Sequence, residues 1–172
     1  ESGFDGNDAE SYLIQAWNFM LAGGALFNNL DYSFSVGSEA GNGKNDAPGS
    51  TDPILRKQLG YLARFMKQLN FLVMRRNPEL IRHAPGCEWQ VFSEPAKEHV
   101  ALLSGLGGRR IEFHLPPGSY SYEIISPTEM RTLDSGALQV TDEKTPHIPL
   151  EAPDGKRRHI DITLKSSEKE SE

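Results

Sequence analysis

The sequence predicts an α+β fold, in which two amphipathic helices and a strand from the end of a β/α barrel are followed by an antiparallel β-sandwich. Three observations lead to this prediction. Apolar residues recur at helical spacing in the first half of the chain, and the period changes to strand-like alternation from about residue 84. Clusters of Gly, Pro, Asp and Ser separate the alternating runs. The 37% hydrophobic and 24% charged residues are typical of a globular protein.

The first helix is predicted within residues 7–24, NDAESYLIQAWNFMLAGG. Asn7 and Glu10 have the spacing of a capping box, and Gly23 with the glycine after it ends the helical pattern. The apolar stripe between them consists of Leu13, Ile14, Trp17, Met20 and Leu21. We expect this stripe to be buried and Trp17 to belong to a core.

A short strand and a second helix are predicted next. Residues 25–34, ALFNNLDYSF, read as a strand, and residues 35–50 are rich enough in Gly, Asn, Asp and Ser to form a long loop. Asp52 suits the N-cap of the second helix and Pro53 its first position. The stripe of this helix consists of Leu55, Leu59, Leu62, Met66 and Leu69.

Short alternating runs fill the rest of the chain and predict a sandwich. Trp89 alternates with Cys87 and Val91, which predicts a core position for its ring. The final residues, SSEKESE, have nothing to bury and are expected to be disordered. The predicted strands lie in residues 87–94, 99–105, 109–115, 120–126, 137–140 and 159–165, with turns at LPPGS, DSG and APDG.

The order helix, strand, helix indicates a piece of a parallel α/β layer, because such helices need a sheet to cover and the strand needs parallel neighbours. One strand cannot form that sheet. We therefore interpret residues 1–83 as the C-terminal segment of a β/α (TIM) barrel, residues 84–165 as the accessory sandwich and residues 166–172 as a disordered tail.

Polar residues near the end of the predicted barrel strand suggest a substrate rim, because active sites of β/α barrels lie at the C-terminal ends of the strands. Residues 24–30 would be the buried part of this strand, and Asn29, Asp31 and Tyr32 would contact substrate. A Tyr ring packs on a sugar, while Asn and Asp bond its hydroxyls. The alternative interpretation is a polar strand end that caps the following loop.

The sequence predicts no metal site, cofactor, nucleic-acid partner or membrane span. The net charge is -6, and the cations form short separate groups, whereas phosphate backbones require clustered cations. The five His residues fall at no recognised metal spacing, and GSEAGNGKN departs from the phosphate-loop pattern. Cys87 is the single cysteine, so no internal disulfide is possible. No apolar run approaches the roughly 20 residues that cross a bilayer.

Three stretches carry a family resemblance: AWNFMLAGGALFNNLDYSFSVGSEAG, DPILRKQLGYLARFMKQLNFLVMR and LPPGSYSYEIISPTEMRTLDSG. They resemble the C-terminal end of a group of bacterial glycoside hydrolases. In that group a clan-A-type β/α barrel is followed by a small β-domain named for collagen binding in a collagenase. The resemblance extends over about residues 1–165, and its most specific parts are AGGALFNNLDYSF and LPPGSY.

This resemblance implies a carbohydrate-active hydrolase, of which the chain supplies the last barrel strand and a sandwich that braces the barrel. It implies that Glu1 is the catalytic nucleophile, while the acid/base Glu lies outside this chain. It also implies a glycan or polysaccharide substrate, a secreted or periplasmic location, and the remainder of the barrel or a second chain as a partner. The alternative interpretation of Glu1 is a solvated terminal residue.

Two other hypotheses stay open. In the first, the chain is a polymer-binding module, for collagen or polysaccharide, without catalytic activity. In the second, the chain is self-sufficient, and both helical stripes pack against the sandwich or against a second copy. A chain with barrel-type helices and no complete barrel is expected to expose an apolar patch.

Overall fold

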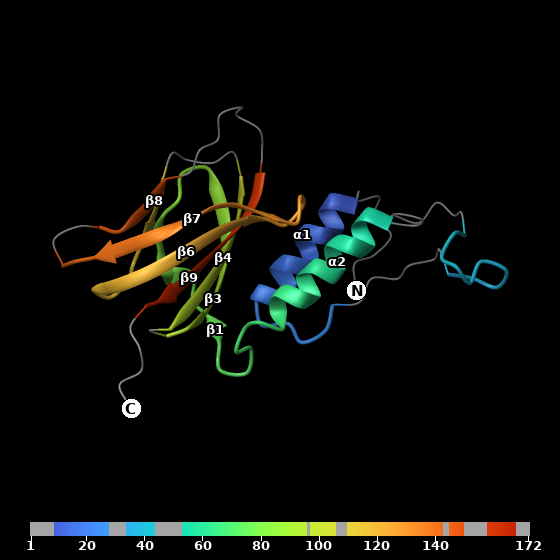
Figure 1. Cartoon of the computed structure of the whole chain (residues 1–172), viewed down its shortest axis with the longest axis horizontal. Coiled ribbons are helices and arrows are strands. Elements are labelled where there is room, and N and C mark those ends of the chain that lie inside the picture. The colour runs from blue at the N-terminus through green and yellow to red at the C-terminus, as the bar shows by residue number, and fades with distance from the viewer. Residues whose placement is uncertain are drawn as a thin grey trace.

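The computed structural model describes residues 9–27, 34–43, 53–95, 97–105, 110–142, 145–149 and 158–167. Within them, two helices lie side by side against one face of a pair of antiparallel sheets (Figure 1). The predicted α+β class with a β-sandwich is confirmed. No helix in this described part is long and apolar enough to cross a bilayer.

The end of the first helix and the start of the second lie at or next to the glycine and proline residues from which these boundaries were predicted. Helix α1 spans Ala9–Leu21 and α2 spans Pro53–Met66, so Pro53 occupies the first helical position as predicted. Gly23 has a φ of 92°, and its N–H donates to the Met20 carbonyl at 3.0 Å. The Gly24 N–H donates to the Phe19 carbonyl at 3.0 Å, and the two bonds together form a Schellman motif. Asn7 and Asp52 lie outside the described residues.

All strand pairs among the described residues are antiparallel and form two sheets. The larger has six strands in the order β1-β3-β4-β9-β6-β7, and the smaller has three in the order β2-β5-β8. The six are β1 (Arg75–Arg76), β3 (Cys87–Glu94), β4 (Glu98–Gly105), β9 (Arg158–Ser166), β6 (Gly118–Ser126) and β7 (Arg131–Val140). The three are β2 (Ile81–His83), which follows the 3-10 helix η1 (Pro78–Leu80), β5 (Arg110–Phe113) and β8 (His147–Pro149).

The sandwich core lies between the two sheets. Alternate residues of the six-stranded sheet, such as Leu103 of β4 and Ile162 of β9, are buried there. The small sheet contributes Ile111, Phe113 and Ile148, each no more than 1% exposed. Side chains alternate between the faces of a strand, so the intervening residues of β4 and β9 face away from this core.

The opposite face of the six-stranded sheet packs against both helices. Phe92, Val100, Leu102 and Ile125 of this face form one apolar cluster with the helical stripes, and we call it the helix–sheet cluster. Trp17 is fully buried in it, as predicted. Its helical and connecting members are Tyr12, Leu13, Ala16, Trp17, Leu21, Leu55, Leu62, Met66, Leu69 and Met74. The helices thus cover an antiparallel sheet of this same chain. The sequence analysis expected them to cover the parallel sheet of a barrel, and it gave packing against the sandwich only as the alternative of a self-sufficient chain.

The predicted strand over residues 25–34 is not formed in its described part. Ala25, Leu26, Phe27 and Phe34 belong to no strand, and Leu26 is 79% exposed instead of buried. A buried parallel strand needs hydrogen-bonded neighbours on both sides, and the described strands of this chain all pair antiparallel elsewhere.

Three details of the sandwich also differ from the sequence predictions. Trp89 is 37% exposed, and its indole N–H donates to the Pro78 carbonyl at 3.2 Å, so the ring is not a core residue. The predicted DSG turn lies inside β7, where Ser135 pairs with Glu123. Ser166 belongs to β9 and the Ser167 N–H donates to the Ser119 carbonyl at 2.8 Å, so the predicted disordered tail begins with ordered residues.

Candidate functional site

The site residues predicted from sequence, Glu1, Asn29, Asp31 and Tyr32, lie outside the described residues. Their roles stay predictions.

The loop that follows the predicted rim is described over residues 34–43 and contacts the first turn of α2. The Arg56 guanidinium lies 5.4 Å from the centroid of the Phe34 ring. Both Nη atoms of Arg56 donate to the Gly41 carbonyl at 3.3 Å. Gly41 has a φ of 72°, and an ideal Cβ there would lie 2.6 Å from the Phe34 ring. Glycine therefore allows this close approach between the loop and α2.

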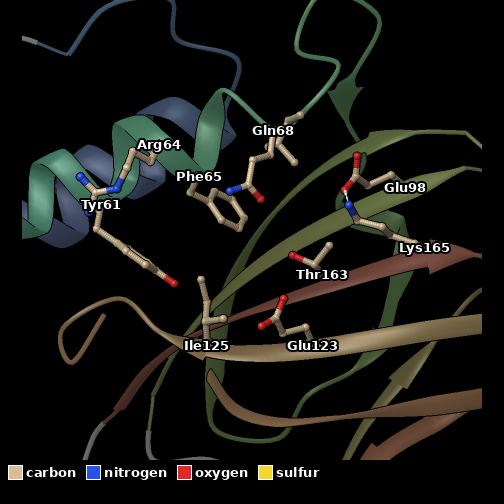
Figure 2. Close-up of a pocket in the computed structure, with 10 residues that line it drawn as sticks. Tyr61, Arg64, Phe65, Gln68, Glu98, Glu123, Ile125, Thr163 and Lys165 are labelled. Carbon is tan, nitrogen blue, oxygen red and sulfur yellow. Dashed lines mark ion pairs between the residues drawn. The ribbon is translucent and has the colours of Figure 1, made fainter. Parts of the chain in front are cut away.

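A cavity of about 250 Å³ lies between α2 and the outer face of the six-stranded sheet (Figure 2). Helix α2 and the turn after it form one wall, and strands β4, β6 and β9 form the other. The lining residues are Tyr61, Arg64, Phe65, Gln68, Leu69, Glu98, Glu123, Ile125, Thr163 and Lys165. This is the candidate site that the described residues offer.

Helical geometry brings the residues of the first wall together. Tyr61, Arg64, Phe65 and Gln68 are spaced i, i+3, i+4 and i+7, so they share one side of the helical segment, next to the buried leucine stripe. The Tyr61 and Phe65 rings also contact Trp17, with centroid distances of 6.5 and 4.9 Å. These contacts fix both rings against the helix–sheet cluster.

Strand pairing places the residues of the second wall side by side. Glu98 of β4 is opposite Lys165 of β9, and Glu123 of β6 is opposite Thr163 of β9. The Lys165 Nζ atom lies 2.9 Å from Glu98 Oε1, so this ion pair bridges two neighbouring strands. The Thr132 hydroxyl donates to Glu123 Oε1 at 2.6 Å. Contacts within the protein thus hold the carboxyl groups of this wall in position.

Asp161 lies on the same face of β9 as Thr163 and is fully buried. It pairs with Leu102 on one side and Ile125 on the other, both members of the helix–sheet cluster. Neither carboxyl oxygen has a hydrogen bond of good geometry in the described part of the chain. Burial raises the pKa of Asp161 well above its usual range; the Thr163 hydroxyl opposes this shift, and the Glu123 carboxylate adds to it. The neutral acid is thus the favoured form.

The Tyr61 phenol lies at the cavity, where the Glu123 and Asp161 carboxyl groups affect its pKa. Partial burial raises the pKa of Tyr61, with further contributions from Glu123 and Asp161. The phenol therefore stays protonated at neutral pH and can donate a hydrogen bond. Figure 2 shows its hydroxyl pointing away from α2, toward the strands.

A second polar cluster joins α1 to the sheet. Ser104 Oγ lies 2.8 Å from His159 Nδ1, and His159 Nε2 lies 3.7 Å from Glu10 Oε1. A Ser, His and acid series resembles a nucleophile arrangement, but Ser104 is buried under the helix, with 9% exposure. We interpret this cluster as a link between the first turn of α1 and strands β4 and β9. Among the described residues, no three His, Cys, Asp or Glu side chains are grouped to hold a metal ion.

Comparison with known proteins places this arrangement in context. No family model and no curated protein matches the sequence. Among solved structures, a glycoside hydrolase family 5 protein from Bacteroides vulgatus ATCC 8482 matches with a TM-score of 0.50 and 13% identity. The match covers 73% of this chain and 27% of that one. The fold is similar to part of a glycoside hydrolase.

A second glycoside hydrolase structure matches 74% of this chain and 29% of its own, with 13% identity and a TM-score of 0.49. The chain thus spans less than a third of the length of either glycoside hydrolase. At this identity the likeness to the family 5 structure concerns the fold.

The sequence analysis did not single out the cavity residues. Tyr61 and Phe65 flank the predicted leucine stripe, and nothing in their spacing separates a cavity wall from a core edge. Asp161 gave no signal either, because in HIDITLK it occupies a polar position of the apolar and polar alternation, where a residue is expected to face solvent.

Proposed function

We propose that this chain is the C-terminal portion of a carbohydrate-active glycoside hydrolase, in which the sandwich braces the helices of a β/α barrel. The likeness of the fold to part of a glycoside hydrolase family 5 structure is the observation that carries this proposal, and the helix–sheet cluster gives the bracing its physical basis. Phe92, Val100 and Leu102 of the sheet are each no more than 2% exposed beneath the helices. Burial of this kind contributes about 1.5–3 kcal/mol per large apolar side chain, which is enough to hold two helices in place.

Exposed apolar side chains on the helical layer support a larger assembly. They belong to α1, α2 and the described parts of the connection between them. Such exposure favours contact with another surface. We assign these separate exposed side chains to contacts with the remainder of the barrel, or with a second chain. Its members are Phe19 (43% exposed), Leu26 (79%), Phe34 (54%), Val36 (102%) and Ile54 (60%).

In this proposal Glu1 is the nucleophile, and Asn29, Asp31 and Tyr32 contact the glycan at the rim. The contacts of Arg56 support the second assignment, because they hold the loop after the rim against α2. The sequence analysis divided the chain at residue 83, but β1 and β2, within residues 75–83, pair with strands of the two sheets. In this proposal the barrel segment therefore ends near residue 74, and the bracing domain follows it. The protein is secreted or periplasmic, as in the bacterial hydrolases that the sequence resembles.

The test is hydrolysis of a panel of glycans by the complete enzyme that carries this chain. Glu1→Gln is expected to lower the rate by about 10³-fold or more, because the covalent step loses its nucleophile. Glu10→Gln, a matched change at an exposed glutamate of α1, is expected to leave the rate near that of the parent.

Two results would contradict the proposal. A Glu1→Gln enzyme that keeps the parental rate would show that Glu1 is not the nucleophile. A parent enzyme that hydrolyses no glycan, while the whole chain is retained on collagen or insoluble polysaccharide, would favour the polymer-binding hypothesis. The whole chain is used because the sandwich alone would expose the sheet side of the helix–sheet cluster.

A further inference from the structure

We propose that the cavity between α2 and the six-stranded sheet binds one neutral sugar residue, as a non-catalytic site between the helical layer and the sandwich. The site consists entirely of described residues and is separate from the barrel rim assigned above. It therefore stands or falls independently of the hydrolase proposal.

The size of the cavity limits the ligand. Pockets for drug-sized molecules have volumes of about 300–1,000 Å³. A volume of about 250 Å³ lies just below that range and suits a single pyranose ring better than a cofactor or a peptide. The cavity is also partly open to solvent, so one sugar of a longer chain could enter while its neighbours stay outside.

The helical wall offers the apolar surface that sugar recognition needs. The rings of Tyr61 and Phe65 face the cavity from successive turns of α2, as Figure 2 shows. Leu69 and Ile125 extend this surface. The C–H face of a pyranose packs on aromatic rings of this kind, and the Trp17 contacts hold both rings in position.

The strand wall offers hydrogen-bonding groups opposite the rings. Glu123 and Thr163 are neighbours in the sheet register, and the Glu98–Lys165 pair lies alongside them. Carboxylate oxygens accept from sugar hydroxyls, whereas an ammonium donates to them. A purely apolar ligand would desolvate these groups without replacing their hydrogen bonds, which is unfavourable.

The charges of the lining favour a neutral ligand. Two carboxylates, Glu98 and Glu123, are balanced by two cations, Arg64 and Lys165. A charged ligand would be attracted by two of these four groups and repelled by the other two. A polyhydroxylated neutral molecule uses both kinds of group, and among common ligands with an apolar face this describes a sugar.

The experiment is a titration of the whole chain with the methyl pyranosides of glucose, galactose, mannose and xylose, followed by amide NMR shifts. We expect saturable binding to at least one glycoside with a Kd of about 1–10 mM, and shifts confined to α2, β4, β6 and β9. Glu123→Gln is expected to weaken binding about three- to tenfold, because hydrogen bonds to a charged acceptor are the stronger ones. Tyr61→Ala is expected to weaken it about tenfold or more.

Matched variants separate binding from folding. Glu88→Gln makes the same change at an exposed position of β3 and should leave the Kd unchanged. Tyr61→Phe keeps the ring and should retain most of the affinity even if Tyr61→Ala does not fold. The proposal is overturned if no glycoside gives saturable shifts, if Glu123→Gln binds as tightly as Glu88→Gln, or if the shifts lie away from the cavity.

Discussion

Asp161 is a fully buried acid in the middle of a sheet, and its surroundings determine which protonation state the fold accepts. Its register partners are Leu102 and Ile125, and the two helices cover this face of the sheet. An ionised carboxylate without hydrogen bonds is costly in such a place, whereas the neutral acid costs much less. The raised pKa of Asp161 expresses this difference. The residue therefore makes stability depend on pH.

The sign of this dependence follows from linkage. Because the folded-state pKa of Asp161 is raised, its favourable contribution is fully present below the ordinary value of 3.8. It is lost as the pH rises from there through the folded-state pKa. Asn cannot ionise, so the free energy of unfolding of Asp161→Asn, relative to that of the parent, should rise as the pH rises from 4 to 8.

Urea unfolding of both proteins across this pH range measures the effect. His99 acts on both equally: its burial lowers its pKa to about 4, so each protein loses stability as the pH falls from 6.5 to about 4. That loss amounts to about 3 kcal/mol and cancels in the difference. A difference between the two proteins that stays constant from pH 4 to 8 would show that Asp161 ionises normally in the fold.

At the scale of single elements, the sequence predictions were accurate where the hydrophobic period agrees with the residues that begin or end an element. The predicted strand over residues 87–94 is β3 to the residue, and residues 159–165 fall within β9. Gly23 ends α1 and Pro53 begins α2, because each has a backbone requirement that few residues meet. Strands β1, β2 and β8 were not predicted, because two or three residues are too few to show an alternation of apolar and polar side chains.

The DSG segment shows why other elements could not be read from sequence. Gly136 is usually a turn signal, but in β7 it pairs with Tyr122, and an ideal Cβ there would lie 2.8 Å from the Tyr122 ring. The glycine makes room for a ring on the neighbouring strand, a long-range contact that no local pattern reveals. The cavity was missed for the same reason, because it exists only where α2 crosses β6 and β9.

Two glycine substitutions test the backbone roles in the helices. Gly23→Ala places a side chain at a φ of 92° and should lower the free energy of unfolding by about 1 kcal/mol. Gly60→Ala makes the same change inside α2, where the nearest atom would be the Arg64 guanidinium at 3.6 Å, and should raise it by about 0.5–1 kcal/mol. Chemical denaturation of both variants gives the two signs, and equal signs would contradict this account of the helix end.

At the scale of the whole molecule, one apolar cluster connects the two predicted domains. The helix–sheet cluster takes Trp17, Leu21 and Leu62 from the helices and Phe92 and Leu102 from the sheet. The sequence analysis predicted correctly that the helices would cover a sheet, but it assigned them to the parallel sheet of a barrel. In the described residues they cover the antiparallel six-stranded sheet instead. An apolar stripe shows that a helix face is buried and does not specify its partner. The described residues on either side of residue 83 therefore share a core, and we expect them to unfold together.

The two tryptophans allow a direct test of this cooperativity. Trp17 is fully buried in the helix–sheet cluster, and Trp89 is 37% exposed on β3. In Trp89→Phe the fluorescence reports on the cluster alone, and in Trp17→Phe it reports on the sandwich alone. Each protein is unfolded in urea and followed by its own fluorescence and its own far-UV circular dichroism, so that any stability change from the substitution affects both signals.

The account predicts that the fluorescence and circular dichroism midpoints coincide within each protein. It would be contradicted by a Trp17 signal that changes at clearly lower urea than the circular dichroism of the same protein, because the helices would then leave a sandwich that remains folded without them.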